Sequence, residues 1–237
     1  MDNIDKIYQE KKDKIEPFAF NKQTSAIFDN MAKRSIPLYN ELQVIIAKII
    51  VASYKPETYF YDIGCSTGNT IIELFKHTNN HIKIIAIDNS KEMIEIAKSK
   101  CAMLTIKWIS AGVENMPFDN ASVINAAYVL QFIRPQKREK ILKTMYKGLI
   151  DGGTLILSEK TITGDTETDN LFSELYDEFK LKNNYSKLEI EQKKAALKDV
   201  LIPFSQEHYV DLLTKIGFRK IHIIVKYLNF MTVLAVK

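Results

Sequence analysis

Short runs of apolar and β-branched residues alternate with helical patterns from about residue 58 to the end of the chain. These runs predict strands at 58–63, 83–87, 105–109, 122–128, 154–159, 220–226 and 230–236. The patterns between them predict helices at 67–76, 91–100, 136–149 and 205–216. This alternation is typical of an α/β fold with a doubly wound, mostly parallel sheet, here of seven strands. Only a few residues separate the last two strands, so a hairpin and an antiparallel final strand are expected.

Two segments lie outside this alternation. Residues 1–57 are an irregular lead-in followed by helical patterns that break at Pro37, with the second helix at about 38–54. Residues 165–202, between the fifth and sixth strands, predict two helices, 169–181 and about 187–199, and the second begins with the capping-box pair Ser186 and Glu189. We therefore expect an N-terminal helical lead-in and lid at 1–57, followed by a domain at 58–237 with a helical insertion at 165–202. Both extra segments are placed to cover the carboxyl edge of the sheet, where such folds bind ligands.

Composition and charge exclude several classes of protein. The 237 residues are 46% apolar and 26% charged, which suits a folded core, and the net charge of +4 is too small to indicate direct nucleic-acid binding. Two cysteines and four scattered histidines form neither a disulfide framework nor a metal-ligand set. The charged N-terminus has no apolar targeting segment, and the most apolar stretch, 44–52, is short and contains Lys48. We expect a cytoplasmic protein with no metal and no membrane partner.

The candidate chemistry lies at the ends of the first two predicted strands. The first strand ends in Asp62 and runs through a turn of small residues, Gly64 to Gly68, directly into a helix. A glycine there lets the backbone approach a ligand closely. The second strand ends in Asp88, about 24 residues after Gly64, where an acidic side chain accepts hydrogen bonds from a ribose diol. The two features together predict a nucleoside site.

The turn favours S-adenosylmethionine over a dinucleotide. A dinucleotide fingerprint has the form G-x-G-x-x-G, but here the glycines are four apart and Cys65 lies between them. Asp62 would also repel a pyrophosphate but suits the cationic ammonium of S-adenosylmethionine. The segments 62–68 and 88–90 resemble the first two motifs of the class I S-adenosylmethionine-dependent methyltransferases. That superfamily commonly has an acid that contacts the adenine amino group where this chain has Gly112. Adenine recognition would then come from the Val113 backbone or from elsewhere.

A narrower resemblance covers the chain from about residue 17 to its end. The segments 34–39, 61–66, 84–90, 130–132, 157–160 and 185–190, the last followed by Gln192 and Lys193, together resemble the carboxy-S-adenosylmethionine synthase family. This resemblance implies transfer of a carboxyl group from prephenate to the methyl carbon of S-adenosylmethionine, with release of phenylpyruvate. A second enzyme would use the carboxy-S-adenosylmethionine to modify the wobble uridine of tRNA. It also implies a homodimer with the inserted helices at the interface.

The resemblance also implies the site residues. Those matched to the nucleoside and its methionine end are Tyr39, Asp62, Gly64, Cys65, Ser66, Asp88, Asn89, Gly112, Val113 and Ala127. Lys194 matches an arginine of the second inserted helix that holds the new carboxylate. Lysine keeps that charge but loses the bidentate geometry. Three matched positions depart from the family: Gly112 replaces an aspartate, Ala127 an asparagine and Lys194 the arginine.

Two other functions remain open from the residues. One is an S-adenosylmethionine-dependent methyltransferase acting on a small molecule or tRNA, and the other is a non-catalytic S-adenosylmethionine-binding module, since no general base is evident. Periodicity alone also allows Lys193 and Lys194 to lie on a solvated helix face, and Cys65 to be a small packed side chain. Lys160, at the end of the fifth strand, faces either the ligand cleft or a salt-bridge partner.

Overall fold

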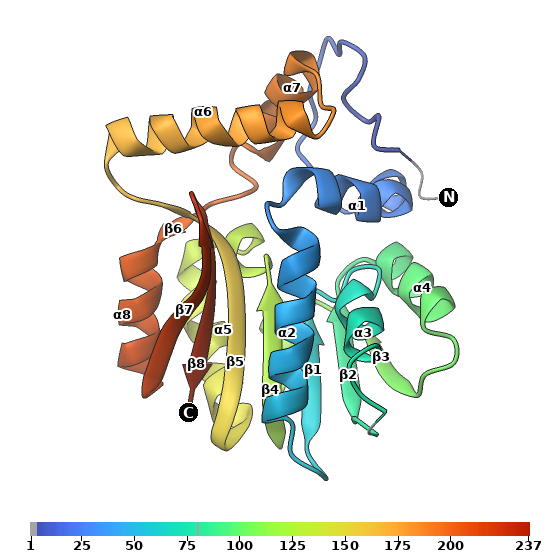
Figure 1. Cartoon of the computed structure of the whole chain (residues 1–237), viewed down its shortest axis with the longest axis vertical. Helices are drawn as coiled ribbons and strands as arrows, with labels where there is room; N and C mark the ends of the chain where they lie inside the picture. The colour runs from blue at the N-terminus through green and yellow to red at the C-terminus, as the bar shows by residue number, and fades with distance from the viewer. Residues whose placement is uncertain (1–3, 80) are drawn as a thin grey trace.

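The computed structural model describes residues 4–79 and 81–237, so residues 1–3 of the predicted lead-in lie outside the described part. Across these residues an eight-stranded sheet forms the centre of the molecule, with the main order β3-β2-β1-β4-β5-β8-β7 (Figure 1). The strands are β1 (Tyr59–Ile63), β2 (Ile84–Asp88), β3 (Ile106–Ser110), β4 (Ala121–Ala127), β5 (Leu149–Ile162), β6 (Phe204–Ser205), β7 (Lys220–Tyr227) and β8 (Phe230–Val236).

The sheet confirms the predicted doubly wound fold. Strands β1 to β5 pair in parallel, and β8 is antiparallel to both β5 and β7. The seven predicted strands form the main path, and the eighth strand is the two-residue β6, which pairs with the end of β5 and is too short for a sequence pattern to indicate. The chain moves outward from β1 to β3 and then returns to β4, so the order reverses between β1 and β4. Open α/β sheets bind their ligands at such a reversal.

Strand β5 is longer than predicted. The predicted strand begins at 154, after Gly152 and Gly153, but these two residues lie within β5, which already begins at Leu149 and pairs there with Ala121. The backbones of Gly152 and Gly153 exchange hydrogen bonds with Lys237 (3.1 and 3.0 Å). Pairing with the C-terminal end of the chain therefore extends the strand through two residues that favour a turn locally.

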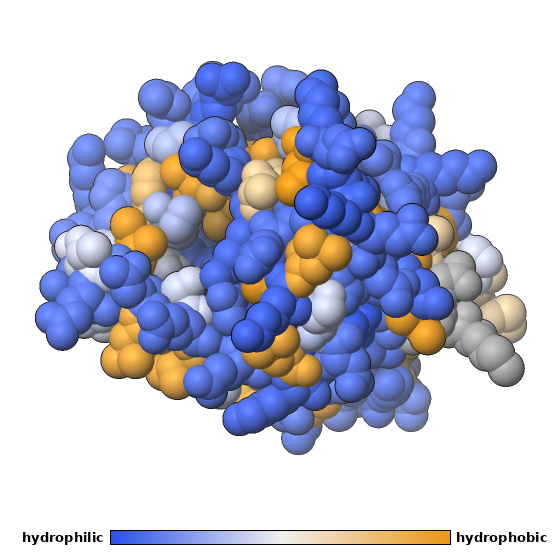
Figure 2. Space-filling model, turned by 90° about the horizontal axis from the view of Figure 1, so that it is seen from above, coloured by the Kyte–Doolittle hydropathy of each residue, from blue (hydrophilic) through white to orange (hydrophobic). Residues whose placement is uncertain are grey.

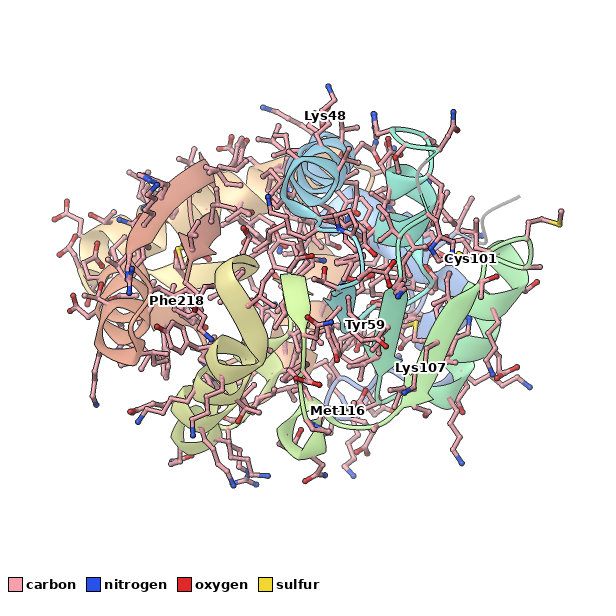
Figure 3. The ribbon with its side chains drawn as sticks, turned by 90° about the horizontal axis from the view of Figure 1, so that it is seen from below. Lys48, Tyr59, Cys101, Lys107, Met116 and Phe218 are labelled. Atoms are coloured by element: carbon pink, nitrogen blue, oxygen red, sulfur yellow. The ribbon has the colours of Figure 1, made fainter. Side chains whose placement is uncertain are left out.

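Helices cover both faces of the sheet. The helices are α1 (Lys22–Ser35), α2 (Tyr39–Ser53), α3 (Asn69–Leu74), α4 (Lys91–Lys100), α5 (Pro135–Gly148), α6 (Thr166–Lys182), α7 (Lys187–Leu197) and α8 (Gln206–Ile216), with single 3-10 turns η1 (Val113–Asn115) and η2 (Leu130–Phe132). One core cluster contains apolar side chains of α5 and α8, and the other contains those of α2, α3 and α4. Figure 3 shows the end of the molecule where β1 begins at Tyr59, with α2 and its outward-pointing Lys48 on one side of the sheet and α5 on the other.

Helices α1, α6 and α7 form a layer above the carboxyl ends of the strands (Figure 1). The predicted break at Pro37 is confirmed, because α1 ends at Ser35 and α2 begins at Tyr39. The Ser186–Glu189 capping box also forms and starts α7. Helix α2 differs from the rest of the lead-in, because its Ile46 and Ile50 are fully buried in the same core cluster as β1.

The first residues described in the chain are held to α7 by one side chain. The Gln192 amide donates to the carbonyl oxygens of Tyr8 (2.9 Å) and Glu10 (2.8 Å), and its own oxygen accepts from the Lys12 N–H (2.8 Å). Phe18 N–H also donates to the Ala196 carbonyl (2.8 Å). Segments about 180 residues apart in sequence thus form one packed layer.

Over the residues described, no single helix is long and apolar enough to cross a membrane. Helices α1 and α2 reach the length and apolar character of a membrane span only when taken together, and the chain bends by 98° between them.

We predict that Gly148→Ala lowers the free energy of unfolding by about 1–3 kcal/mol, the range for an overpacked site. A β-carbon at Gly148 would lie 2.3 Å from Phe118 Cβ and 2.6 Å from its carbonyl carbon. Alanine is a better helix former than glycine by about 1 kcal/mol. A net loss of stability in Gly148→Ala would therefore come from the steric clash. Urea unfolding followed by circular dichroism measures the change.

Gly112→Ala is the matched control, because Gly112 has an ordinary φ of −71° and the nearest atom to an added β-carbon is the movable Glu114 carboxylate. Its expected effect is within about 0.5 kcal/mol. Equal losses for the two variants would contradict the steric explanation.

Candidate functional site

A cavity of about 1140 Å³ lies between the carboxyl ends of the strands and the layer formed by α1, α6 and α7. Seen from above, this end of the molecule is mostly hydrophilic, and apolar side chains show between the polar ones in separate patches (Figure 2). The cavity wall contains ten of the eleven residues that the sequence assigns to the site: Tyr39, Gly64, Cys65, Ser66, Asp88, Asn89, Gly112, Val113, Ala127 and Lys194. The eleventh, Asp62, does not line it.

The turn after β1 has the backbone shape that its small residues predict. Gly64 (φ +64°) and Gly68 (φ +82°) are both left-handed, and Ser66 between them also has a positive φ of 49°. A β-carbon at Gly64 would lie 2.4 Å from Val129 Cγ2, so only glycine fits there. Because Ser66 and Gly68 are not helical, α3 begins at Asn69, later than the sequence predicts.

Cys65 is a packed residue of this turn. Its N–H donates to the Ile87 carbonyl (3.0 Å), which continues the β1–β2 ladder past the end of the strand. The side chain is 5% exposed, and burial raises the pKa of the Cys65 thiol well above its usual value. A buried thiol that holds its proton is a poor nucleophile, which favours the packing interpretation.

Asp88 joins the turns after β1 and β2. One carboxylate oxygen accepts the Ser66 N–H (2.9 Å) and the other accepts the Ser90 N–H (2.9 Å). Each oxygen keeps a further lone pair, and the side chain lines the cavity next to the exposed Asn89. Burial raises the pKa of Asp88, and the bonds from these N–H groups oppose the rise. This is a suitable acceptor for the two hydroxyl groups of a ribose.

Asp62 lies just beneath the cavity surface. Its Oδ1 accepts from the Asn125 amide (2.8 Å), while Oδ2 is buried with no hydrogen-bond partner among the described residues. The pKa of Asp62 is raised to about 7, chiefly by burial; the Asn125 hydrogen bond lowers it and the nearby charge of Asp88 raises it. A buried carboxylate oxygen without a donor is costly. A cationic ammonium group at this point would satisfy it, so the residue fits the methionine end of S-adenosylmethionine.

A third acid, Asp29 of α1, fixes the upper layer to this turn, and the sequence analysis does not identify it. Its Oδ1 accepts from Thr67 (2.5 Å) and Asn69 (2.8 Å), and its Oδ2 pairs with Lys100 of α4 (2.7 Å). The Asn69 amide also donates to the Tyr39 hydroxyl (3.0 Å). Tyr39 is 8% exposed and lies on the cavity wall, where burial raises its pKa to about 12, so its hydroxyl stays neutral.

At the end of β3 the structure supplies a carboxylate that the sequence analysis missed. Gly112 precedes η1, and Val113 and Glu114 follow it on the cavity wall. The Glu114 carboxylate oxygen Oε2 lies 2.9 Å from the position that a β-carbon at Gly112 would take. The Glu114 carboxylate therefore lies beside Gly112, the position where the resemblance implies an acid. Its other oxygen is 3.5 Å from the Lys137 ammonium.

Lysines dominate the other half of the cavity. Lys194 is part-exposed and pairs with Asp177 of α6, with Ser173 Oγ at 3.4 Å. Lys193 is not solvated, because its ammonium donates to Ser35 (2.9 Å) and lies 3.8 Å from Asp5, and burial lowers its pKa to about 8. The predicted solvated face therefore holds only for Lys194, since α7 packs against α1.

The described residues contain no group of three or more histidine, cysteine, aspartate or glutamate side chains arranged to hold a metal ion. Acidic side chains, among them Asp88 beside the glycine turn, line one end of the cavity, and lysines line the other end. This arrangement can hold a nucleoside with a cationic amino-acid tail next to an anionic second molecule.

Comparison with known proteins shows which families resemble this chain. The profile of the family described as "Methyltransferase domain" matches residues 60–153. The carboxy-S-adenosyl-L-methionine synthase of Trichodesmium erythraeum is 38% identical over 93% of this chain and 89% of its own length. Those of Campylobacter jejuni (38% identical, 93% of this chain, 94% of the relative) and Methylococcus capsulatus (34%, 98% and 99%) match similarly.

Solved structures show the same fold at lower identity. A putative S-adenosyl-L-methionine-dependent methyltransferase of Methanococcus maripaludis aligns with a TM-score of 0.62 at 22% identity, over 96% of this chain and 97% of that one. An O-methyltransferase family 2 protein of Planctomyces limnophilus aligns with a TM-score of 0.64 at 15% identity, over 92% of this chain and 62% of that one. These solved structures therefore share the fold of this chain.

We predict that the affinity for S-adenosylmethionine rises with pH up to about 7. Bound ammonium stabilises ionised Asp62, whose pKa is about 7 in the free protein, so below that pH the ligand must displace a proton. The affinity changes by at most about tenfold per pH unit, and it becomes independent of pH above the pKa of Asp62. Calorimetric titrations between about pH 5.5 and 7.5 measure it.

Asp62→Asn should bind weakly with little pH dependence over the same range. Adenosine, which lacks the amino-acid tail, is the ligand control and should show a much smaller pH dependence in the parent protein. A parallel rise for adenosine and S-adenosylmethionine would argue against Asp62 as the titrating group.

We predict that Glu114→Ala weakens S-adenosylmethionine binding about tenfold, the usual effect of removing a charged hydrogen-bond acceptor. Its carboxylate lines the cavity beside Gly112, and we expect it to accept from the adenine amino group. The inosine analogue, which has a carbonyl there, should bind the parent protein poorly, and Glu114→Ala should remove most of this discrimination. Lys137→Ala, which removes only the ion-pair partner, is the control; an unchanged preference for adenine in Glu114→Ala would exclude the role.

Proposed function

Because the chain belongs to the carboxy-S-adenosyl-L-methionine synthase family, we propose that it transfers a carboxyl group from prephenate to the methyl carbon of S-adenosylmethionine. One observation carries the proposal: the glycine turn and the lysines of α7 line the same cavity. A methyltransferase needs the turn, but it has no need for cations around the methyl group. A reaction that creates a carboxylate there does.

The atoms of the proposed reaction balance without an oxidant or a reductant. A bond forms between the methyl carbon and the carboxyl carbon, and the bond from that carboxyl carbon to the prephenate ring breaks. The methyl carbon loses one proton, which leaves as water with the ring hydroxyl, and the ring becomes aromatic in phenylpyruvate. The product keeps its sulfonium charge and gains a carboxylate, which requires a cation beside it.

We assign that cation to Lys194. Its ion pair with Asp177 is part-exposed, and such pairs contribute about 0–1 kcal/mol, so the ammonium can change partners at little cost. A lysine ammonium acts on a carboxylate as a single point charge, whereas an arginine guanidinium makes two parallel hydrogen bonds to it. We therefore expect the carboxylate to be bound more weakly by lysine. Ala127, on the same wall, leaves open space where the family has an asparagine.

The product would act as a carboxymethyl donor for the wobble uridine of tRNA, through a second enzyme. This chain would then need to bind only small molecules in the cytoplasm, which agrees with its modest net charge. We also propose a homodimer through the inserted helices. Leu171 and Leu175 of α6 support it, since they are 51% and 38% exposed and lie one helical turn apart.

The test is mass spectrometry of the small molecules released after the purified protein has been incubated with S-adenosylmethionine and prephenate. The expected species is heavier than S-adenosylmethionine by one CO₂, with phenylpyruvate formed in equal amount. S-adenosylmethionine recovered unchanged would refute carboxyl transfer. Conversion to S-adenosylhomocysteine with a methylated acceptor would favour a methyltransferase.

We predict that Lys194→Ala loses the carboxylated product while its affinity for S-adenosylmethionine stays within about twofold, because only the new carboxylate needs the ammonium. Lys194→Arg should retain the product more tightly, since the guanidinium restores two parallel bonds. Lys198→Ala, an exposed lysine one turn further along, is the control. A parallel fall in substrate binding and product formation in Lys194→Ala would contradict the assignment.

A further inference from the structure

Lys160 differs from the other lysines that line the inner part of the cavity. It follows Glu159 near the end of β5, and its ammonium lies over the ring of Tyr176 (4.6 Å to the centroid) and near that of Phe230 (5.8 Å). No hydrogen bond or ion pair links this ammonium to an oxygen in residues 4–79 and 81–237. Lys180, by contrast, is 2.8 Å from Asp177.

The charges around Lys160 leave it without an anion. Lys180 and Lys194 both pair with Asp177, so this carboxylate already has two ammonium partners and Lys160 is not one of them. Burial lowers the pKa of Lys160 to about 8, and repulsion from Lys180 and Lys194 adds to the effect. At neutral pH most of the group still carries its charge, and a negative ligand beside it would be bound strongly because the site is shielded from water.

A second unpartnered polar group lies next to Lys160. Asn229, in the turn between β7 and β8, is 9% exposed and lines the cavity, and its Oδ1 has no hydrogen-bond partner among the described residues. Its carbonyl accepts from the Thr161 N–H (2.7 Å), and Phe230 pairs with Lys160 across the strands, so Asn229 directly precedes the residue opposite Lys160 and both line the same cavity. Rotation of the amide presents its NH₂ group to an anion.

Aromatic rings enclose this corner of the cavity. Phe230 packs on Tyr176 (5.1 Å between ring centroids) and meets Tyr128 edge to face (6.1 Å). All three line the cavity. Such walls accept a flat ring, while the ammonium and amide accept a carboxylate. Strand β5 lies two strands from β1, or about 10 Å from the glycine turn, which leaves room for S-adenosylmethionine between the two.

We propose that Lys160 and Asn229 bind the carboxylate that stays on the carboxyl donor, while Tyr128, Tyr176 and Phe230 hold its ring. The inference rests on the proposed function, because it concerns the second substrate of that reaction. The two carboxylates of the donor then have separate cations. Lys160 receives the one that is retained in the keto acid, and Lys194 receives the one that is transferred.

The test uses phenylpyruvate, which has the ring and the retained carboxylate, as a probe in calorimetric titrations of the protein saturated with S-adenosylhomocysteine. Lys160→Met keeps the length and packing of the side chain and removes the charge, and should weaken phenylpyruvate binding about tenfold or more. Lys198→Met, which removes an exposed lysine of the same cavity, should change it less than about twofold. Lys160→Arg should recover part of the affinity.

Phenylacetone, the neutral analogue without the carboxylate, separates a charge contact from a packing role. Its affinity should be the same in the parent protein and in Lys160→Met. In steady-state kinetics, the KM for prephenate should rise about tenfold in Lys160→Met, while the affinity for S-adenosylmethionine stays unchanged. Equal loss of phenylacetone and phenylpyruvate binding, or no loss of either, would overturn the subsite.

The outcomes also distinguish this inference from the proposed function. Lys160-dependent binding of phenylpyruvate in a protein that makes no carboxylated product would support the subsite and refute carboxyl transfer. A protein that makes the product, with the KM for prephenate unaffected by Lys160→Met, would refute the subsite and support the transfer. A parent protein that does not bind phenylpyruvate at all would overturn the subsite directly.

Discussion

The geometry of the site depends on how closely the backbone after β1 approaches its neighbours. Gly64 has no side chain, so Val129 from the end of β4 packs directly over it. The Asp88 carboxylate then ties the same turn to the end of β2 through the N–H groups of Ser66 and Ser90. With three strand ends held together in this way, the two acids Asp62 and Asp88 lie at the point where the sheet order reverses. A side chain at position 64 would separate them.

The second half of the cavity depends on segments that do not belong to the sheet. Asp29 fastens α1 to the glycine turn through Thr67, and Gln192 fastens α7 to the N-terminal segment. These polar contacts hold the layer in which α6 and α7 carry their lysines. The resulting cavity has an acidic end for a cationic nucleoside and a basic end for an anion. This division of charge agrees with the proposed transfer of a carboxyl group between two such molecules.

Most of the fold could be predicted because its signals are local. The β-branched runs, Pro37 and the Ser186 capping box gave the strands, the helix break and the start of α7. The structure differs in two places: pairing with the distant Lys237 draws Gly152 and Gly153 into β5, and the local positive φ values at Ser66 and Gly68 delay the start of α3. The glycine turn and Asp88 could likewise be assigned from spacing alone. Glu114 could not, because its oxygen reaches the space beside Gly112 only through the shape of η1.

The sequence by itself determined the doubly wound sheet, the nucleoside turn and the resemblance to a family. Each of these depends on the order and spacing of residues within a few turns of chain. Only the tertiary structure decided which charged groups are satisfied and which are not. Lys193 and Lys194 are neighbours in sequence, yet one is buried against Ser35 and the other is part-exposed beside Asp177. Lys160 has no oxygen partner in the described residues, because strand pairing and α6 surround it with aromatic rings, and such a contact between distant segments leaves no local pattern in the sequence.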